Sequence, residues 1–252
     1  MKLRIIDTIL FNIRAFGFRQ GLKLPVYIYG KVKFYQIGKI EIHCPLKRAI
    51  VIIGMNAHDT SAPYSIFNNQ GTIEVHGRVY LHHGSRLTNK GRIVFGANNI
   101  FSHNTEFDIK ERIEFGHDVS VGYQSVFTDS DVHYSVDVST RRVYRNTKAI
   151  RIGNYNWFGS HTYVKKGTVT PDYTMVASPN ALLSKDYSNL PPYTVLGGCP
   201  ARPIKQGLRR VYKFRSENAI RDFFADNPHA EYYSIVDDMD LDDFCKLFDI
   251  PQ

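Results

Sequence analysis

The sequence contains little cysteine. Its 252 residues include three cysteines, Cys44, Cys199 and Cys245, which are odd in number, far apart and without the close spacing of metal ligands. This pattern argues against a disulfide-stapled scaffold and favours a reducing compartment. Hydrophobic residues make up 43% of the chain, which is enough for the core of one large domain with appendages.

Long hydrophobic runs are also absent. The first 24 residues are largely apolar, but Arg4, Asp7, Arg14 and Arg19 interrupt each run before it reaches the length of a membrane span. We therefore expect neither a transmembrane helix nor a signal peptide, and we predict a cytoplasmic protein. The same stretch is basic and amphipathic, which would allow peripheral association with the inner face of the membrane.

Acidic residues are scarce outside the C-terminal tail. From Asp222 to the end there are nine acidic residues and one basic residue, which leaves 31 basic and 15 acidic residues upstream. A basic body can bind nucleic acid, an anionic membrane or a negatively charged small substrate. Because the basic residues are scattered singly among strand residues, we expect no nucleic-acid partner and favour a phosphorylated ligand.

A six-residue period runs through the middle of the chain. Six consecutive hexads begin with residues that could sit in a core: Ile152, Phe158, Val164, Thr170, Val176 and Leu182. The fifth positions are small: Asn156, Thr162, Thr168, Thr174 and Asn180. Upstream, the same period is led by Phe115, Val121 and Phe127, with fainter repeats around Leu81, Leu87, Phe95 and Phe101. A fixed period of six fits neither a helix nor a hairpin meander and indicates short strands stacked in coils.

Both flanks of the repeat region favour helices. Residues 3–18 predict an amphipathic helix that packs on the coils or on a neighbouring subunit through an apolar face formed by Leu3, Ile6, Leu10 and Ile13. A second helical segment is predicted to start at Leu208, with Val211 and Tyr212 on its apolar side. A third is predicted from Leu241, capped by Asp240.

The period breaks between residues 133 and 149. A loop that leaves a solenoid costs little core and can carry chemistry on a rigid support. His133 stands at the root of this loop, in the segment TDSDVHYSVD, with Asp129, Asp131 and Asp137 nearby. A neutral imidazole can accept a hydroxyl proton at physiological pH, and a carboxylate can orient it. The pattern predicts His133 as a general base and Asp131, or one of the other two aspartates, as its orienting acid.

The segment IGNYNWFGSHTYV from Ile152, followed by SKDYSNLPPYTVLGGCPARPIK, resembles the signature of hexapeptide-repeat acyltransferases. The resemblance covers roughly residues 50–205 and implies a mainly β protein, a left-handed parallel β-helix with flanking N- and C-terminal α-helices. The expected organisation is an N-terminal helical segment at 1–25, a β-helix domain at 26–205 and a C-terminal helical extension at 206–252. The resemblance also implies a homotrimer with its site in the cleft between adjacent β-helices.

The resemblance further implies acetyl-CoA as the acyl donor and carries the family's catalytic histidine, found in a D-x-D-x-H context, onto His133. The positions that match family contacts to the cofactor are Trp157, Gly159, Ser160, Ser178, Lys185, Arg202 and Lys205. Trp157 is expected to pack on the pantetheine or the ring system, and Arg202 and Lys205 to meet the phosphates.

No metal site is expected from the histidines. Some β-helix proteins of this fold bind zinc through three histidines on adjacent repeats, which requires an H-x4-H pair. Gly122 stands where a partner for His117 would lie. We expect no metal site from the remaining histidines of the repeat region either: His76, His82, His83, His103 and His161.

The sequence thus predicts an acetyl-CoA-dependent O-acetyltransferase acting on a sugar hydroxyl in surface polysaccharide, lipopolysaccharide or capsule biosynthesis. Two alternatives stay open: transfer to an amino sugar or to a serine hydroxyl, and a non-catalytic β-helix scaffold at a membrane surface. A basic run in the loop indicates an acidic or phosphorylated acceptor, or the cofactor itself; it comprises Arg141, Arg142, Arg145 and Lys148.

Overall fold

The computed structural model describes residues 2–55, 63–236 and 238–245. The chain divides into two compact units, residues 1–207 and 208–252. The division falls two residues after the boundary expected from the sequence, because strand β24 (Arg202–Gln206) still pairs with the first unit. The N-terminal helical segment belongs to the first unit and is not a domain of its own.

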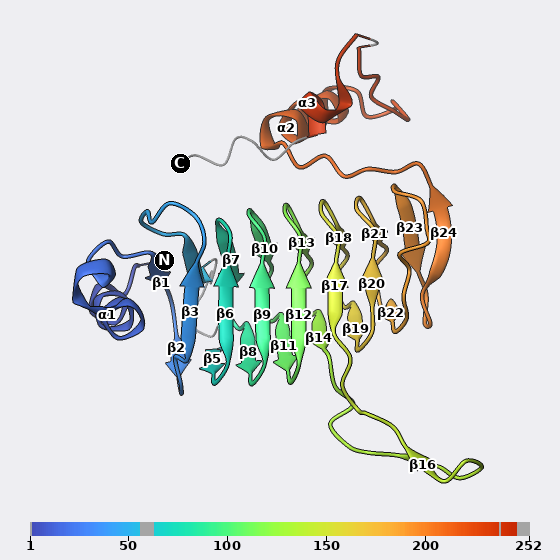
Figure 1. Cartoon of the computed structure of the whole chain (residues 1–252). Helices are drawn as coiled ribbons and strands as arrows, with labels where there is room; N and C mark the ends of the chain where they lie inside the picture. The colour runs from blue at the N-terminus through green and yellow to red at the C-terminus, as the bar shows by residue number, and fades with distance from the viewer. Residues whose placement is uncertain (1, 56–62, 237, 246–252) are drawn as a thin grey trace. The chain divides into compact units, whose positions relative to one another are not determined.

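The first unit is a parallel β-helix with three faces, formed by three sheets whose strands follow one another in rotation. Figure 1 shows the coils advancing from β1 to β23, and the chain winds around their common axis in a left-handed sense, as the resemblance implies. The first sheet contains β1 (Val26–Ile28), β4 (Val51–Met55), β7 (Val79–His82), β10 (Asn99–Phe101), β13 (Ser120–Val121), β18 (Trp157–Phe158), β21 (Met175–Val176), β23 (Thr194–Gly197) and β24. The second sheet contains β2 (Val32–Phe34), β5 (Ser65–Asn69), β8 (Arg86–Asn89), β11 (Glu106–Ile109), β14 (Val126–Thr128), β19 (Tyr163–Lys165) and β22 (Leu182–Leu183). The third sheet contains β3 (Lys39–Ile42), β6 (Thr72–Val75), β9 (Arg92–Phe95), β12 (Arg112–Phe115), β17 (Ile150–Ile152) and β20 (Val169–Thr170).

Three edges separate these faces, and they position the site described below. The first edge joins the first sheet to the second, the second edge joins the second sheet to the third, and the third edge joins the third sheet back to the first. Because each coil passes every edge once, residues far apart in the sequence line up along one edge.

The interior is a column of apolar side chains contributed by successive coils. In the first sheet, Leu81 pairs with Phe101, Phe101 with Val121, Val121 with Phe158, and Phe158 with Val176. All five side chains are buried. Rings also meet across the interior; Phe101 lies 4.9 to 5.5 Å, between ring centroids, from Phe95, Phe107 and Phe115. The predicted inward positions are therefore confirmed for these rungs.

The upstream repeats look faint in the sequence because their coils are longer. Leu81 pairs with Phe101, twenty residues later, whereas Phe158 pairs with Val176, eighteen residues later. The extra residues lie in the third sheet, where β9 buries both Ile93 and Phe95 instead of a single side chain.

The last hexad is also shifted from the prediction. Val164 pairs with Leu183, which is fully buried, and not with Leu182. Asn180, taken as a small corner residue, is exposed.

Small polar residues close the turns, as the hexad pattern predicts. The hydroxyls of Thr162, Thr168 and Thr174 each donate a hydrogen bond to the carbonyl oxygen three residues earlier, over 2.7 to 2.9 Å. Asn156 Nδ2 donates to the carbonyl oxygens of Asn154 and Pro171, both at 2.9 Å. A buried hydroxyl or amide must be hydrogen-bonded, so these residues hold each corner by satisfying carbonyl groups that the strands leave free.

The N-terminal helix α1 (Ile5–Gly21) uses a different face from the one expected. Its buried residues are Thr8, Phe11, Asn12 and Gly21. Asn12 exchanges hydrogen bonds with the backbone of Val26, and Phe11 packs its ring 4.9 Å from Phe34. Ile6, by contrast, is 74% exposed, and Leu10 is 46% exposed. The expected face does not pack on the coils, because the polar pair Thr8 and Asn12 bonds to strand β1 and fixes the rotation of the helix; its packing on a neighbouring subunit stays a prediction.

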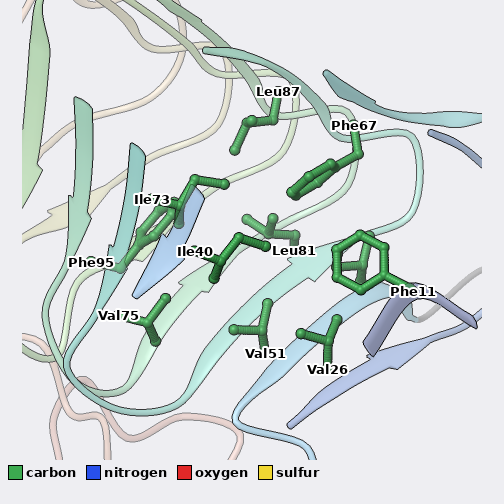
Figure 2. A pocket seen from close by; sticks show the side chains of 11 residues that line it. Phe11, Val26, Ile40, Val51, Phe67, Ile73, Val75, Leu81, Leu87 and Phe95 are labelled. Atoms are coloured by element: carbon green, nitrogen blue, oxygen red, sulfur yellow. The ribbon is translucent and has the colours of Figure 1, made fainter. Parts of the chain in front are cut away.

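A small apolar cavity of about 20 Å³ lies beneath this helix (Figure 2). Phe11, Val26 and Phe67 are among the side chains that line it, and its lining is entirely apolar. A space of this size holds about one water molecule, and an apolar lining gives that water no hydrogen-bond partner. This cavity is therefore a packing defect and not a ligand site.

An arm leaves the solenoid between β14 and β17 (Figure 1). It contains the short antiparallel hairpin of β15 (Val136–Asp137) and β16 (Arg142–Val143). At its root, Asp131 N donates to Asn146 O at 2.9 Å, and Lys148 N donates to Asp129 O at 3.0 Å. The predicted excursion at 133–149 is confirmed, and the structure adds that it is a hairpin.

The second unit contains α2 (Phe214–Asp226) and α3 (Leu241–Cys245). Residues 208–213 are not helical, so the predicted start at Leu208 is wrong. Asp240 Oδ1 accepts a hydrogen bond from Asp242 N at 2.8 Å, which confirms the predicted cap of α3.

All three cysteines are free thiols. Within the parts of the chain that the structure describes, no helix is both long and apolar enough to cross a bilayer.

Candidate active site

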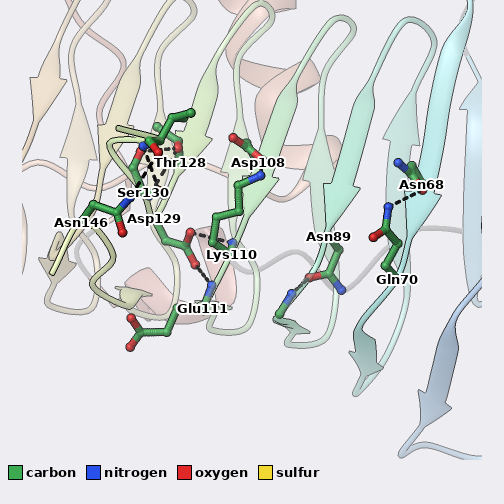
Figure 3. Close-up of polar contacts among 12 residues, drawn as sticks. Asn68, Gln70, Asn89, Asp108, Lys110, Glu111, Thr128, Asp129, Ser130 and Asn146 are labelled. Atoms are coloured by element: carbon green, nitrogen blue, oxygen red, sulfur yellow. Dashed lines mark hydrogen bonds and ion pairs between the residues drawn. The ribbon is translucent and has the colours of Figure 1, made fainter. Parts of the chain in front are cut away.

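Asp129, the first aspartate of the predicted cluster, holds a neighbouring turn and not a histidine. Its fully buried carboxylate accepts hydrogen bonds from the backbone amides of Lys110, Glu111 and Arg112, at 2.7 to 2.8 Å (Figure 3). Burial raises the pKa of Asp129, and the three amide donors oppose that shift. Asp129 thus anchors the coil from which the arm departs.

Asp131, the residue expected to orient His133, is bound by two lysines of the next coil. Its carboxylate lies 2.6 Å from Lys166 Nζ and 3.2 Å from Lys165 Nζ. The hydrogen bonds from Lys166 and Lys165 hold the pKa of Asp131 below its ordinary value. Sequence reasoning missed both lysines, although the hexad VKKGTV places Lys165 at the end of β19 and Lys166 at the start of the second edge, one coil after the arm.

Asp137, the third aspartate, shapes the hairpin. Its Oδ1 accepts hydrogen bonds from Ser139 N, Ser139 Oγ and Thr140 N. These bonds, the one from the Ser139 side chain foremost, lower the pKa of Asp137. Within the described chain none of the three aspartates is hydrogen-bonded to the His133 ring.

His133 is exposed at the root of the arm. Its backbone amide donates to the carbonyl oxygen of Asp131 at 2.7 Å, which fixes the start of the excursion. An exposed imidazole that is not hydrogen-bonded to a neighbouring aspartate can accept a proton from a bound molecule. The predicted base is therefore accessible, and the carboxylate of the predicted acid is bound by lysines and not by the His133 ring.

The residues expected to contact the cofactor lie in the first sheet or on the first edge, with the exception of Lys185. Trp157 is half-buried on β18, on the outer face between Ser120 and Met175 of the neighbouring coils. Gly159, Ser160 and Ser178 follow at the turn into the second sheet. A Cβ on Gly159 would lie 2.6 Å from Ser178 Cβ, so glycine is required there for coil packing. Ser178 is exposed, and its hydroxyl donates to Ser160 O at 2.9 Å.

The predicted cationic residues fall in two places. Arg202 and Lys205 are exposed on β24, which pairs antiparallel with β23 at the C-terminal end of the first sheet. Lys185 follows β22 and so lies on the second edge, with its ammonium 5.4 Å from the centre of the Tyr187 ring. Lys185 is therefore on the edge that carries the arm, and not on the edge that carries Ser178.

The two predicted halves of the site thus occupy different edges of one β-helix. His133 leaves the second edge, after β14, whereas Trp157, Gly159 and Ser178 belong to the first sheet and the first edge. The second sheet separates these two edges. A single chain consequently does not bring the predicted base onto the predicted donor-binding edge.

Two of the remaining histidines, His83 and His103, belong to a ring stack at the first edge. His83, His103 and Tyr123 stack at the first edge with ring centroids 5.1 and 4.9 Å apart. Burial, assisted by the nearby His83 and His103 rings, lowers the pKa of His82 to about 4. His117 Nδ1 accepts a hydrogen bond from Ala97 N at 2.9 Å, which leaves its remaining proton on Nε2.

A hollow of about 360 Å³ lies in the second unit, lined in part by Lys213, Arg215, Tyr233 and Phe244. None of the residues predicted from the sequence lies in it. It belongs to a part of the chain outside the hexapeptide repeats, so we assign it no role in the site.

No family model matches the chain, and no curated protein matches it. Among solved structures, it is similar to the polySia-specific acetyltransferase NeuO, at 15% identity and a TM-score of 0.49, covering 81% of this chain and 99% of that one. The polysialic acid O-acetyltransferase OatWY matches at 16% identity and a TM-score of 0.37, covering 78% and 99%. The hexapeptide-repeat acetyltransferase VCA0836 from Vibrio cholerae O1 biovar eltor, complexed with acetyl coenzyme A, matches at 21% identity and a TM-score of 0.38, covering 56% and 67%. Because these TM-scores lie below 0.5, we base no argument on the likenesses; the chain's own stacked coils show that it is a left-handed parallel β-helix of hexapeptide repeats.

Proposed function

We propose that the protein is an acetyl-CoA-dependent O-acetyltransferase that acts on a sugar hydroxyl. The observation that carries this proposal is the position of His133. The solenoid is interrupted at that point, the three nearby aspartates are engaged elsewhere, and the imidazole is left exposed. A ring in this state can serve as a general base for a hydroxyl group.

In this proposal, His133 carries out one proton transfer in each direction. Acetyl-CoA, when bound, supplies the thioester carbonyl. A ring nitrogen of His133 accepts the proton of the sugar hydroxyl as its oxygen attacks that carbonyl, and the imidazolium returns the proton to the departing thiolate. An ester bond forms, a thioester bond breaks, and the histidine ends neutral.

The first edge fits the donor in its shape and charge. Gly159, Ser160 and Ser178 are small, so the backbone runs close to the surface there. Arg202 and Lys205 offer exposed cations at the end of the same sheet, where phosphates could bind. Trp157 supplies an aromatic surface on β18 of the first sheet, opposite Met175 of the next coil.

A homotrimer accounts for the separation of the two edges. If His133 of one copy faces the first edge of the next, both halves of the site meet between subunits. This arrangement is the one that the resemblance implies, and it needs no movement of the coils.

Mixed oligomers test the shared site. His133→Ala and the double variant Arg202→Ala/Lys205→Ala are each expected to lose most activity at low acetyl-CoA concentration. Co-expressed, they form some interfaces that contain His133 from one chain and both cations from the other, and activity should return. Failure to regain activity in mixed oligomers would place the whole site within one chain.

The acceptor is tested by following coenzyme A release with a panel of hydroxyl sugars, amino sugars, serine and surface glycans. We expect release with hydroxyl acceptors and a product that mild alkali cleaves, as an ester requires. An alkali-stable product formed with amino sugars alone would favour N-acetylation instead.

The membrane scaffold remains a second candidate because helix α1 exposes apolar side chains beside basic ones. Ile5, Ile6 and Phe18 are 63 to 74% exposed, and Arg14 and Arg19 lie on the same helix. Retention on anionic vesicles without thiol release in any acceptor assay would favour the scaffold over the cytoplasmic enzyme. Retention together with thiol release would describe an enzyme held at the inner face of the membrane.

A further inference from the structure

The N-terminal end of the third sheet carries a repeated tripeptide. Glu41-Ile42-His43 and Glu74-Val75-His76 occupy equivalent places on two adjacent coils. In the parallel pairing of β3 with β6, Glu41 lies opposite Glu74, and His43 N donates to Val75 O at 2.8 Å.

Strand alternation places the four polar side chains together. Val75 is buried and Ile42 packs against the core, so they point inward. Because side chains two residues apart share one face of a strand, both glutamates and both histidines lie on the outer face. The sequence therefore builds a quartet of two carboxylates and two imidazoles across neighbouring coils.

The distances bring the donor groups of this quartet close together. The His43 and His76 rings stack with centroids 4.9 Å apart and planes inclined by 16°. One ligand atom from each of His43, Glu74 and His76 lies within 4.8 Å of the others. His43 Nε2 is 4.0 Å from Glu41 Oε2. In the parts of the chain that the structure describes, this is the one such group of three or more histidine, cysteine or acidic residues.

Burial distinguishes the quartet from an ordinary solvated patch. Glu74 is 5% exposed and therefore has little freedom to move, whereas His43 and His76 are exposed and can turn their rings. Zinc bonds to nitrogen and oxygen measure about 2.0–2.2 Å, so the ligands must close in around the ion. A fixed carboxylate with two mobile imidazoles permits that closure.

Two cations now balance the carboxylates. Arg92, on β9, forms an ion pair with Glu74, and Lys39 lies 2.6 Å from Glu41. Both are partly exposed, with side-chain exposures of 48% and 67%, and can move into solvent. A divalent ion would replace the Arg92 charge beside Glu74.

We propose that His43, His76 and Glu74, with Glu41 beside them, form a binding site for a divalent transition-metal ion. Two imidazoles and one carboxylate are a typical zinc ligand set, and imidazole also suits nickel and copper. The bound ion would link the β3 and β6 coils near the end of the solenoid. The site rests on residues remote in sequence from the arm and is independent of acetyl transfer.

Calorimetric titration of untagged, chelator-treated protein with Zn²⁺ tests the site. We expect one ion per chain for the wild type, and at least about tenfold weaker binding for His43→Ala and for His76→Ala, because loss of even an outer-shell partner weakens metal binding by about that much. His229→Ala removes an exposed histidine of the second unit and is the matched control, with unchanged binding. Co²⁺ should give the visible absorption of a low-coordinate site in the wild type and lose it in both ligand variants.

Arg92→Gln sharpens the test because it removes the competing cation and keeps every ligand. Zinc should bind more tightly to this variant and raise its melting temperature more than that of the wild type. Wild-type protein that binds no zinc at micromolar concentrations overturns the proposal. So does one-to-one binding that survives in the His43→Ala/His76→Ala double variant.

Discussion

The coils of the solenoid and the arm that leaves them differ in how deeply their apolar side chains are buried. In the coils, Phe101, Phe127 and Phe158 are fully buried, and each pairs in register with the coils on either side. In the arm, Val138 is 87% exposed and Tyr134 is 70% exposed. Stability therefore resides in the coils and is nearly independent of the arm, so substitutions can separate folding from chemistry.

The largest expected effect comes from the arm. His133→Ala should lower turnover roughly a hundredfold to ten-thousandfold, the usual contribution of a positioned general base. The free energy of unfolding should stay within about 0.5 kcal/mol of the wild type, because the ring is exposed. Coenzyme A release and urea denaturation measure the two quantities, and an active His133→Ala enzyme would exclude this residue as the base.

The coils should respond in the opposite way. Phe101→Ala removes a fully buried ring that meets three other phenylalanines, and it should lower the free energy of unfolding by about 3–5 kcal/mol. Tyr144→Ala on the exposed arm is the matched control, with a change within about 0.5 kcal/mol. Similar losses for the two variants, measured by denaturant unfolding, would show that the arm is part of the folding unit.

A second property of the coils is sensitivity to acid. The pKa of His82 falls from its ordinary 6.5 to about 4 in the folded chain, chiefly through burial. The unfolded chain therefore takes up a proton first, and stability should fall as the pH drops from about 6.5 towards 4. The shift corresponds to about 3 kcal/mol. His82→Gln should flatten this dependence in urea unfolding measured from pH 7 to pH 4.5, and an unchanged slope would assign it to other groups.

The smallest effect is expected where arm and coil meet. Asp131→Asn removes the carboxylate that binds Lys165 and Lys166, and the cost should be below about 1 kcal/mol because the pair is exposed. The pKa of Asp131 is lowered, so this contribution is present above pH 3.8 and disappears as the pH falls through the folded value. Unfolding at pH 6 and pH 3 measures it.

The same variant also tests the catalytic role predicted for Asp131. Because the carboxylate contacts lysines, Asp131→Asn should change turnover by less than about tenfold. A loss as large as that of His133→Ala would restore Asp131 as the orienting acid.

Much of the fold was predictable because its evidence is local and repeated. The hexads from Ile152 to Val176 have their first positions buried and their small fifth positions at corners, as the pattern predicts. The faint upstream repeats were harder to interpret because third-sheet strands such as β9 bury two side chains, which lengthens each coil. The rotation of α1 was missed because hydrogen bonds of Thr8 and Asn12 to β1, and not apolar periodicity, decide it.

The candidate site was predictable in its residue types but not in its partners. The break in the period located His133, since a histidine at a solenoid interruption stands out in the sequence. The partners of Asp129 and Asp131 come from other coils, 17 to 35 residues away, and no local spacing identifies them. The same holds for the quartet of Glu41, His43, Glu74 and His76, whose members meet only when two coils stack.

The amino-acid sequence by itself determined that short strands coil with a six-residue period and that the coil is interrupted at residue 133. Inward and outward side chains alternate along a strand, whichever coils stack on it. The tertiary structure alone decided which edge each side chain reaches. Stacking brings remote residues to within hydrogen-bonding distance, and the number of residues in each coil, which a one-dimensional pattern does not fix, sets that alignment.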